Sequence, residues 1–224
     1  MKYSALISKK ISKEPEIIGR DRYLNSAVLI PIVELDGIEY LLFQKRSQKV
    51  RQPGEVSFPG GHYEFQKDNG FLATALRETC EELGIEKKKI RVLGKLGTYV
   101  GPMGVIVEAF IGKLNISSLK ELKIDAEEVD RVFILPIDFF INTEPLVYFS
   151  RVELHPKIKN EEGEIIDLLP VKKLGLPDRY AFPWTKGKHR VFIYKNDEET
   201  VWGITAELVY ELVNKLKPDN NEKL

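Results

Sequence analysis

The segment LATALRETCEELGI, from Leu72 to Ile85, constrains the fold more than any other part of the sequence. At 100° per residue its side chains divide between an apolar and a polar face of a helix. The apolar face carries Leu72, Ala75, Leu76, Thr79 and Leu83, and the polar face carries Arg77, Glu78, Glu81 and Glu82. Gly84 follows at the place where a left-handed residue ends a helix. We therefore predict a short amphipathic helix with three carboxylates on one ridge.

The three carboxylates need a positive partner. Like charges three or four residues apart repel on a helix, and the helix dipole disfavours Glu81 and Glu82 near the C-terminus. Arg77 can pair with Glu81 four residues later. Mg²⁺ or Mn²⁺ suits the remaining carboxylate oxygens. The alternative is a solvated acidic face, which the FPGG sequence just before the helix makes less attractive.

Composition narrows the function classes. Lys plus Arg and Asp plus Glu each number 34, so no net charge indicates nucleic acid or membrane as a partner. No apolar run approaches the roughly 18–20 residues of a membrane span, and no signal-peptide core is visible. The single cysteine, Cys80, is expected to be a packed thiol in a reducing compartment. We expect a cytoplasmic protein, and the sequence leaves a homodimer open.

The order of the remaining elements predicts an α/β protein with one domain over residues 1–224. Strands are expected at 26–35, 38–44, 90–100, 105–114, 132–135, 147–154, 189–195 and 199–202, with helical segments at 137–141 and 204–216. Three segments are expected to lie outside this framework: a loosely packed lead-in at 1–24, a long irregular loop at 155–188 and a frayed tail at 217–224.

The helix resembles the signature of the Nudix hydrolases, Arg-Glu-x-x-Glu-Glu-x-Gly followed by an apolar residue, here Arg77 to Ile85. The preceding segment LLFQKRSQKVRQPGEVSFPGG, Leu41 to Gly61, resembles the pattern of the coenzyme A pyrophosphatase subfamily. The matching positions are Leu41, Leu42, Arg46, Ser47, Arg51, Gly54, Ser57, Phe58, Pro59, Gly60 and Gly61. The sequence TVWGITAELV near the C-terminus also resembles that subfamily. The resemblance implies a Nudix-type α/β/α sandwich with a mixed β-sheet.

The sequence departs from the family pattern between the two motifs. His62 stands where the subfamily usually has lysine, and Asn69 stands where the general pattern has glutamate. Asp68 and Glu64 are acidic residues close to the expected places. The roles of His62, Glu64 and Asp68 are therefore left open.

The resemblance implies an active site around the predicted helix. Glu78, Glu81 and Arg77 are the expected catalytic residues, and Glu78, Glu82, Glu81 and Gly61 the expected ligands of Mg²⁺ or Mn²⁺. Arg46, Arg51, Gly60 and Lys45 are expected to bind the substrate, because arginine grips phosphate with two hydrogen bonds and glycine backbone approaches it closely.

Several assignments stay open at this level. The group that deprotonates water is Glu78, Glu81 or an acid outside the motif such as Glu108, which reads equally well as an outward strand residue. His62 and His189 fit acid–base, phosphate-binding or structural roles. The aromatic residues Tyr180, Phe182 and Trp184 suit either adenine or pantetheine packing or a loop anchor.

The leading functional hypothesis is hydrolysis of the diphosphate bond of coenzyme A or its thioesters to 3′,5′-ADP and a 4′-phosphopantetheine. The alternatives are a Nudix hydrolase for ADP-ribose, a dinucleotide or another nucleoside diphosphate derivative, and a module that binds nucleotides without hydrolysis.

Overall fold

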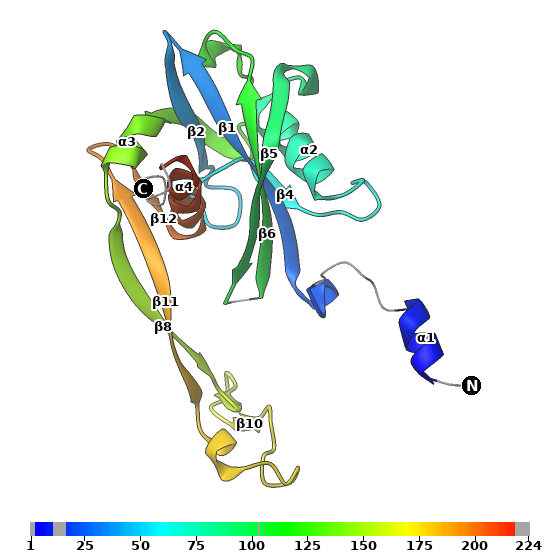
Figure 1. Cartoon of the computed structure of the whole chain (residues 1–224). Helices are drawn as coiled ribbons and strands as arrows, with labels where there is room; N and C mark the ends of the chain where they lie inside the picture. Colours follow the sequence, from blue (N-terminus) through cyan, green and yellow to red (C-terminus); the bar gives the residue numbers. More distant parts are fainter. Residues whose placement is uncertain (1–2, 11–16, 103, 218–224) are drawn as a thin grey trace, which may run out of the picture.

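The computed structural model describes residues 3–10, 17–102 and 104–217 and is built around a seven-stranded mixed sheet (Figure 1). The strand order is β3-β2-β1-β6-β5, and β4 also pairs with β1 while β7 pairs with β2. Strands β1 and β6 run parallel and the other pairs are antiparallel. The strands are β1 (Leu24–Leu35), β2 (Ile38–Arg46), β3 (Val56–Ser57), β4 (Gly60–His62), β5 (Ile90–Gly101), β6 (Val105–Leu114) and β7 (Val129–Pro136).

Helices cover both faces of this sheet. The period-two alternation of β1 sends Ala27 and Leu29 into a core beneath α2 (Phe71–Leu83), and Ile30 and Ile32 into a second core. The second core contains α4 (Gly203–Leu216) and Phe140 of α3 (Ile137–Asn142). The predicted α/β/α sandwich with a mixed sheet is therefore confirmed.

Helix α2 ends as predicted, at a Gly84 with φ 59°, where a Cβ would lie 2.0 Å from the Lys123 carbonyl oxygen. Two positions of the predicted helical wheel are wrong. Leu72 is 36% exposed, and Glu82 is only 3% exposed. The wheel treats a helix as having one covered side, whereas α2 also packs against β4, and β4 covers the end of the helix that carries Glu82.

The segment 146–191, called the arm here, projects from the sandwich (Figure 1). Its long strands are β8 (Leu146–Leu154) and the first part of β11 (Trp184–Lys195), and β11 also pairs with β12 (Thr200–Trp202). The end of the arm holds the hairpin β9 (Lys157–Lys159) and β10 (Ile165–Asp167) and the 3-10 turn η4 (Asp178–Ala181). Residues 155–188 are thus more regular than predicted, and β11 begins five residues before the expected start.

The predicted lead-in contains two helical segments, and its large apolar side chains Tyr3, Ile7 and Ile18 are exposed. It contains α1 (Tyr3–Lys10) and η1 (Arg20–Arg22), and Arg20 forms an ion pair with Glu108 and lies over the Phe71 ring, 4.2 Å from its centroid. Short 3-10 turns also occur at η2 (Lys87–Lys89) and η3 (Leu119–Glu121). Residues 11–16 of the lead-in and 218–224 of the predicted tail lie outside the described residues. No helix among the described residues is long and apolar enough to cross a membrane.

Candidate functional site

The Gly60-Gly61 pair joins the coenzyme A pyrophosphatase-like loop to α2. Gly60 belongs to β4 and has φ 155°, and a Cβ there would lie 2.3 Å from the Ala27 carbonyl oxygen. Its backbone amide donates a 2.8 Å hydrogen bond to the Glu82 carboxylate. This amide was a predicted phosphate contact, but it is engaged with Glu82, so its observed contribution is to hold that carboxylate.

Gly61 makes room for the first glutamate of the motif. A Cβ at Gly61 would lie 2.4 Å from both the Cδ and an oxygen of the Glu78 carboxylate. The Glu78 side chain therefore rests directly against backbone, with only 15% of it exposed. Glu78 can occupy this position only because residue 61 has no side chain.

Arg77 is the centre of the charge network. Its predicted pair with Glu81 is confirmed at 3.0 Å, and it also contacts Glu78 at 2.9 Å. Its two-point partner is Asp68, which accepts from Nε at 2.9 Å and from Nη2 at 3.1 Å. Asp68 also accepts hydrogen bonds from the Thr74 hydroxyl and the Glu64 amide. The Arg77 hydrogen bonds hold the pKa of Asp68 at about 2, against an ordinary value of 3.8.

The pKa values of Glu78 and Glu82 are raised, in contrast to the lowered pKa of Asp68. Burial raises the pKa of Glu82 to about 7, although the Gly60 amide and the nearby Gln44 side chain act against that rise. Burial also raises the pKa of Glu78, despite Arg77. Within the described ranges no ion pair reaches Glu82, and the Gln44 amide and Ser57 hydroxyl are buried without hydrogen-bond geometry to any partner. A nearby cation would favour the anionic form of Glu82.

The donor set fits a hard divalent cation in its chemistry, because carboxylate oxygens predominate and the innermost one lacks a positive partner. In their present orientations no three His, Cys, Asp or Glu side chains of the described residues converge as a metal site. Glu78 and Glu81 both pair with Arg77 in these orientations.

The predicted substrate-binding residues lie in and beside an ordered loop between β2 and β3. Arg46 donates from Nε to the Arg51 carbonyl oxygen at 2.9 Å, while its backbone amide bonds the Glu55 carbonyl at 2.9 Å. The Arg51 side chain is exposed. Lys45 instead contacts buried Glu199 at 3.5 Å, and Glu199 also pairs with Arg131.

Glu108 is not an outward strand residue. It is 2% exposed and is held by Arg20, by Lys95 at 2.5 Å and by the Thr98 hydroxyl at 2.8 Å. Burial favours a higher pKa, but the hydrogen bonds from these three groups outweigh it and lower the pKa of Glu108. The outward-strand reading of Glu108 is therefore wrong, because its partners lie on a neighbouring strand and on the lead-in, whereas its role as a base stays a prediction.

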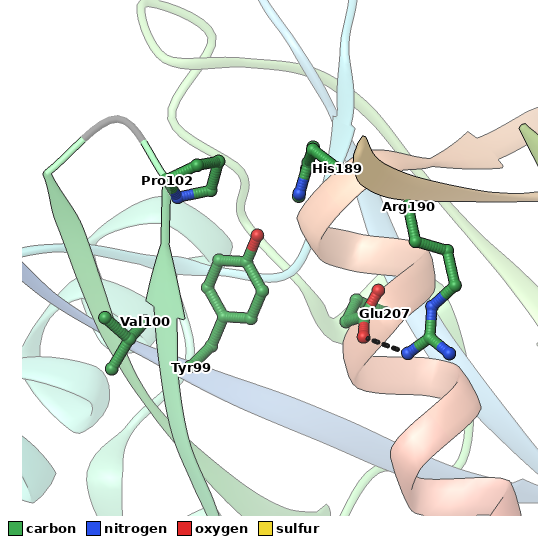
Figure 2. Close-up of a pocket in the computed structure, with 6 residues that line it drawn as sticks. All are labelled: Tyr99, Val100, Pro102, His189, Arg190 and Glu207. Carbon is green, nitrogen blue, oxygen red and sulfur yellow. Dashed lines mark hydrogen bonds and ion pairs between the residues drawn. The ribbon is translucent and has the colours of Figure 1, made fainter. Parts of the chain in front are cut away.

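His189 lies on the other side of the sheet from α2. His189 lines a 310 Å³ cleft with Tyr99, Pro102 and the ion pair Arg190–Glu207, whose charged atoms are 2.9 Å apart (Figure 2). Tyr99 packs against the core on the α4 side, so this cleft lies on the sheet face opposite α2.

The aromatic run lies in the arm. There Tyr180 packs edge-on against Trp184, with ring centroids 5.4 Å apart, and Phe182 is 69% exposed. Nearer to α2, His62 is exposed at the end of β4, and Glu64 pairs with Lys67 at 2.8 Å and lies 3.9 Å from the Arg77 guanidinium.

Sequence reasoning missed three buried-charge arrangements: Asp68 with Arg77, Glu199 with Lys45 and Arg131, and Glu108 with Arg20 and Lys95. Asp68 was visible as an acid in the region between the motifs. Lys95 and Glu108 lie on paired strands, and the other contacts of these two arrangements join residues 68 to 154 positions apart, so no local pattern reveals them.

Comparison with known proteins places these observations in a family. The NUDIX domain model matches residues 24–138. Human mitochondrial coenzyme A diphosphatase NUDT8 is 35% identical over 204 residues, 89% of this chain and 72% of that protein. Nudix hydrolase 3 of Caenorhabditis elegans is 29% identical over 96% of this chain and 82% of its own length. Mouse peroxisomal coenzyme A diphosphatase NUDT7 is 37% identical over 56% of this chain, and that match spans 51% of the mouse protein.

The family match covers the sheet, the Arg46–Gly61 loop and α2, which are the elements that build the carboxylate site. The chain therefore belongs to the Nudix domain family of pyrophosphohydrolases, among the members that resemble coenzyme A pyrophosphatases.

Proposed function

We propose that this enzyme hydrolyses the diphosphate bond of coenzyme A or acyl-coenzyme A in a reaction that depends on Mg²⁺ or Mn²⁺. The products are 3′,5′-ADP and 4′-phosphopantetheine or its acyl form. The observation that carries the proposal is the union of the two motifs: glycines of the coenzyme A pyrophosphatase-like loop directly seat the glutamates of the Nudix helix. Similarity to proteins named coenzyme A diphosphatase supports the same substrate.

The carboxylates of Glu78, Glu82 and Glu81 and the carbonyl of Gly61 would hold the metal. When bound, it would neutralise the diphosphate oxygens and lower the pKa of an attacking water. Gly60 fixes Glu82 through its amide, and Asp68 fixes Arg77 so that the guanidinium stays beside the glutamates. The candidates for accepting the proton of water are Glu78, which is largely buried, and Glu81, which is 60% exposed.

The other end of the site provides the substrate contacts. Coenzyme A has a 3′-phosphate in addition to its diphosphate, and arginine binds such groups through two parallel hydrogen bonds. We assign this contact to Arg51 and Arg46, with Lys45 assisting. Among the residues that the structure describes, the exposed Arg51 side chain makes no hydrogen bond or ion pair, and Arg46 contacts only its backbone carbonyl oxygen.

The test combines substrate specificity with one variant. The purified chain is incubated with coenzyme A, ADP-ribose and a dinucleoside polyphosphate, with Mg²⁺, Mn²⁺ or a chelator, and the products are resolved by mass spectrometry. We expect 3′,5′-ADP only with metal, and a loss of at least about a hundredfold in turnover for Glu82→Gln. The matched control is Glu86→Gln, which alters an exposed glutamate paired with Lys88.

Cleavage of ADP-ribose or the dinucleotide without cleavage of coenzyme A would overturn the substrate assignment. Unchanged turnover in Glu82→Gln would overturn the assigned site. We also propose no nucleic-acid partner, on the basis of the neutral net charge, and a cytoplasmic location, on the basis of the single cysteine.

A further inference from the structure

The arm exposes an unusual amount of apolar surface. Twelve of its large apolar side chains, with exposed fractions from 38% to 69%, are Leu146, Val147, Tyr148, Phe149, Leu154, Ile158, Ile165, Ile166, Leu168, Leu174, Leu176 and Phe182. Taking roughly 200 Å² per large side chain and half of it as exposed gives an apolar area on the order of 1,000 Å². A monomer's largest apolar patch is typically only a few hundred Å².

Both faces of the arm contribute to this area. Tyr148 and Phe149 are neighbours on β8, so their side chains point to opposite faces of the strand pair. They are nevertheless 59% and 60% exposed. The arm therefore lacks a covered face at this point, and a bare two-stranded ribbon is only marginally stable in water. Burial against another surface would stabilise it.

The backbone of β8 also offers a free edge. Among the described strands β8 pairs only with β11, and β11 lies between β8 and β12. An unpaired strand edge presents amide and carbonyl groups to any chain that approaches it.

Charge along the arm indicates what covers it. A cleft of 510 Å³ in the middle of the arm is lined by Phe149, Ser150, Arg151 and Lys188, and Arg151 also pairs with Glu153 at 2.5 Å. Farther along, the turn between β9 and β10 carries three exposed acids, Glu161, Glu162 and Glu164. The basic cleft and the acidic turn thus lie at different positions along the same arm. Two arms side by side in opposite directions place each acidic turn beside the other copy's basic cleft.

We propose that this chain forms a two-fold symmetric homodimer through its arms, with the acidic turn of one copy seated against the Phe149–Arg151 part of the other. A two-fold contact uses the same surface on both subunits, and the arm carries both halves of the complementary pair. Because the apolar area is divided between two faces of the arm, one face supplies on the order of 500 Å² of the roughly 800 Å² per partner in a stable interface, and polar side chains supply the rest. The overall net charge of zero adds no repulsion between copies.

The first experiment measures the mass of the full chain by sedimentation equilibrium between about 1 and 200 µM. We expect a dimer with a micromolar or tighter dissociation constant. Phe149→Glu should raise that constant at least about thirtyfold, as loss of an aromatic anchor does. The matched control, Phe65→Glu, alters an 86% exposed aromatic outside the arm and should leave it unchanged.

The second experiment reverses the charges. Arg151→Glu alone, and Glu161→Lys with Glu162→Lys, should each weaken the dimer, and the triple variant should regain most of the lost affinity. Circular dichroism checks folding. If the Phe149 variant is unfolded, amide exchange in residues 146–154 of the native chain replaces it and should slow as concentration rises. A native monomer at 200 µM, or a dimer indifferent to all arm variants, would overturn the proposal.

Discussion

Replacement of Asp68 by asparagine tests whether Arg77 is held in place by this single carboxylate. The Asp68 side chain is 2% exposed and bonds both Nε and Nη2 of Arg77. Asparagine has nearly the same shape and can still accept from Thr74, so the substitution removes the charge and leaves the packing. Arg77 would keep Glu78, the largely exposed Glu81 and a longer 3.9 Å contact with Glu64.

The magnitude follows from the pKa of Asp68. It falls from 3.8 to about 2, chiefly through the Arg77 hydrogen bonds. At about 1.4 kcal/mol per unit this corresponds to about 2 kcal/mol of stability at neutral pH. Because the folded-state pKa is the lower one, this stability is fully present above pH 4 and is lost as the pH falls toward 2.

Urea unfolding of the native chain and Asp68→Asn, at several pH values between 7 and 2.5, measures the difference. We expect the variant to be about 2 kcal/mol less stable at pH 7, and the gap to narrow below pH 4. Turnover should fall as well, because a loosened Arg77 pairs more tightly with Glu78 and Glu81. Equal stability at pH 7, or a gap that is constant down to pH 2.5, would refute the reasoning.

Three further substitutions probe separate parts of the site. Gly61→Ala should leave the unfolding midpoint nearly unchanged, since the flexible Glu78 side chain can move aside, but should lower turnover at least about tenfold because Glu78 is displaced; unchanged turnover would contradict the seating of Glu78. Arg51→Ala should raise the Michaelis constant for coenzyme A more than that for its 3′-dephospho form. The control, Lys49→Ala in the same loop, should change both constants equally. Equal increases for Arg51→Ala would argue against a contact with the 3′-phosphate. Glu108→Gln should lower the free energy of unfolding in urea by about 1–3 kcal/mol, because its cationic partners lose their anion, while turnover changes less than about tenfold. A loss of turnover of more than a hundredfold in a folded protein would support Glu108 as the base.

Local patterns predict the helix and its lead-in because their physical causes are local. The period of apolar residues from Ala75 to Leu83 and the left-handed Gly84 define α2 without reference to the rest of the chain. The pairing of Arg77 with Glu81 also follows from helix geometry alone. The strands β1, β2 and β6 are readable for the same reason, since each alternates or is continuously β-branched between turns.

Long-range packing explains what the sequence conceals. Glu82 lies on the polar side of a helical wheel, yet a three-residue strand, β4, crosses that side and buries it. Glu108 alternates as an outward strand residue, yet Arg20 from the lead-in and Lys95 from β5 cover it. In both cases the element that buries the glutamate is short or distant in the sequence, so the periodicity of the helix or strand itself does not predict the burial.

Gly60 and Gly61 both contact glutamates of α2, but the two positions require glycine for different reasons. A side chain at position 60 would meet the backbone of β1, whereas one at position 61 would meet only the movable carboxylate of Glu78. Position 60 is therefore constrained by the fold and position 61 by the site, although both are glycines in one motif. Because Gly61 acts through Glu78, the losses of turnover in Gly61→Ala and Glu78→Gln should not add when combined, and two additive losses would mean that the loop and the helix act separately.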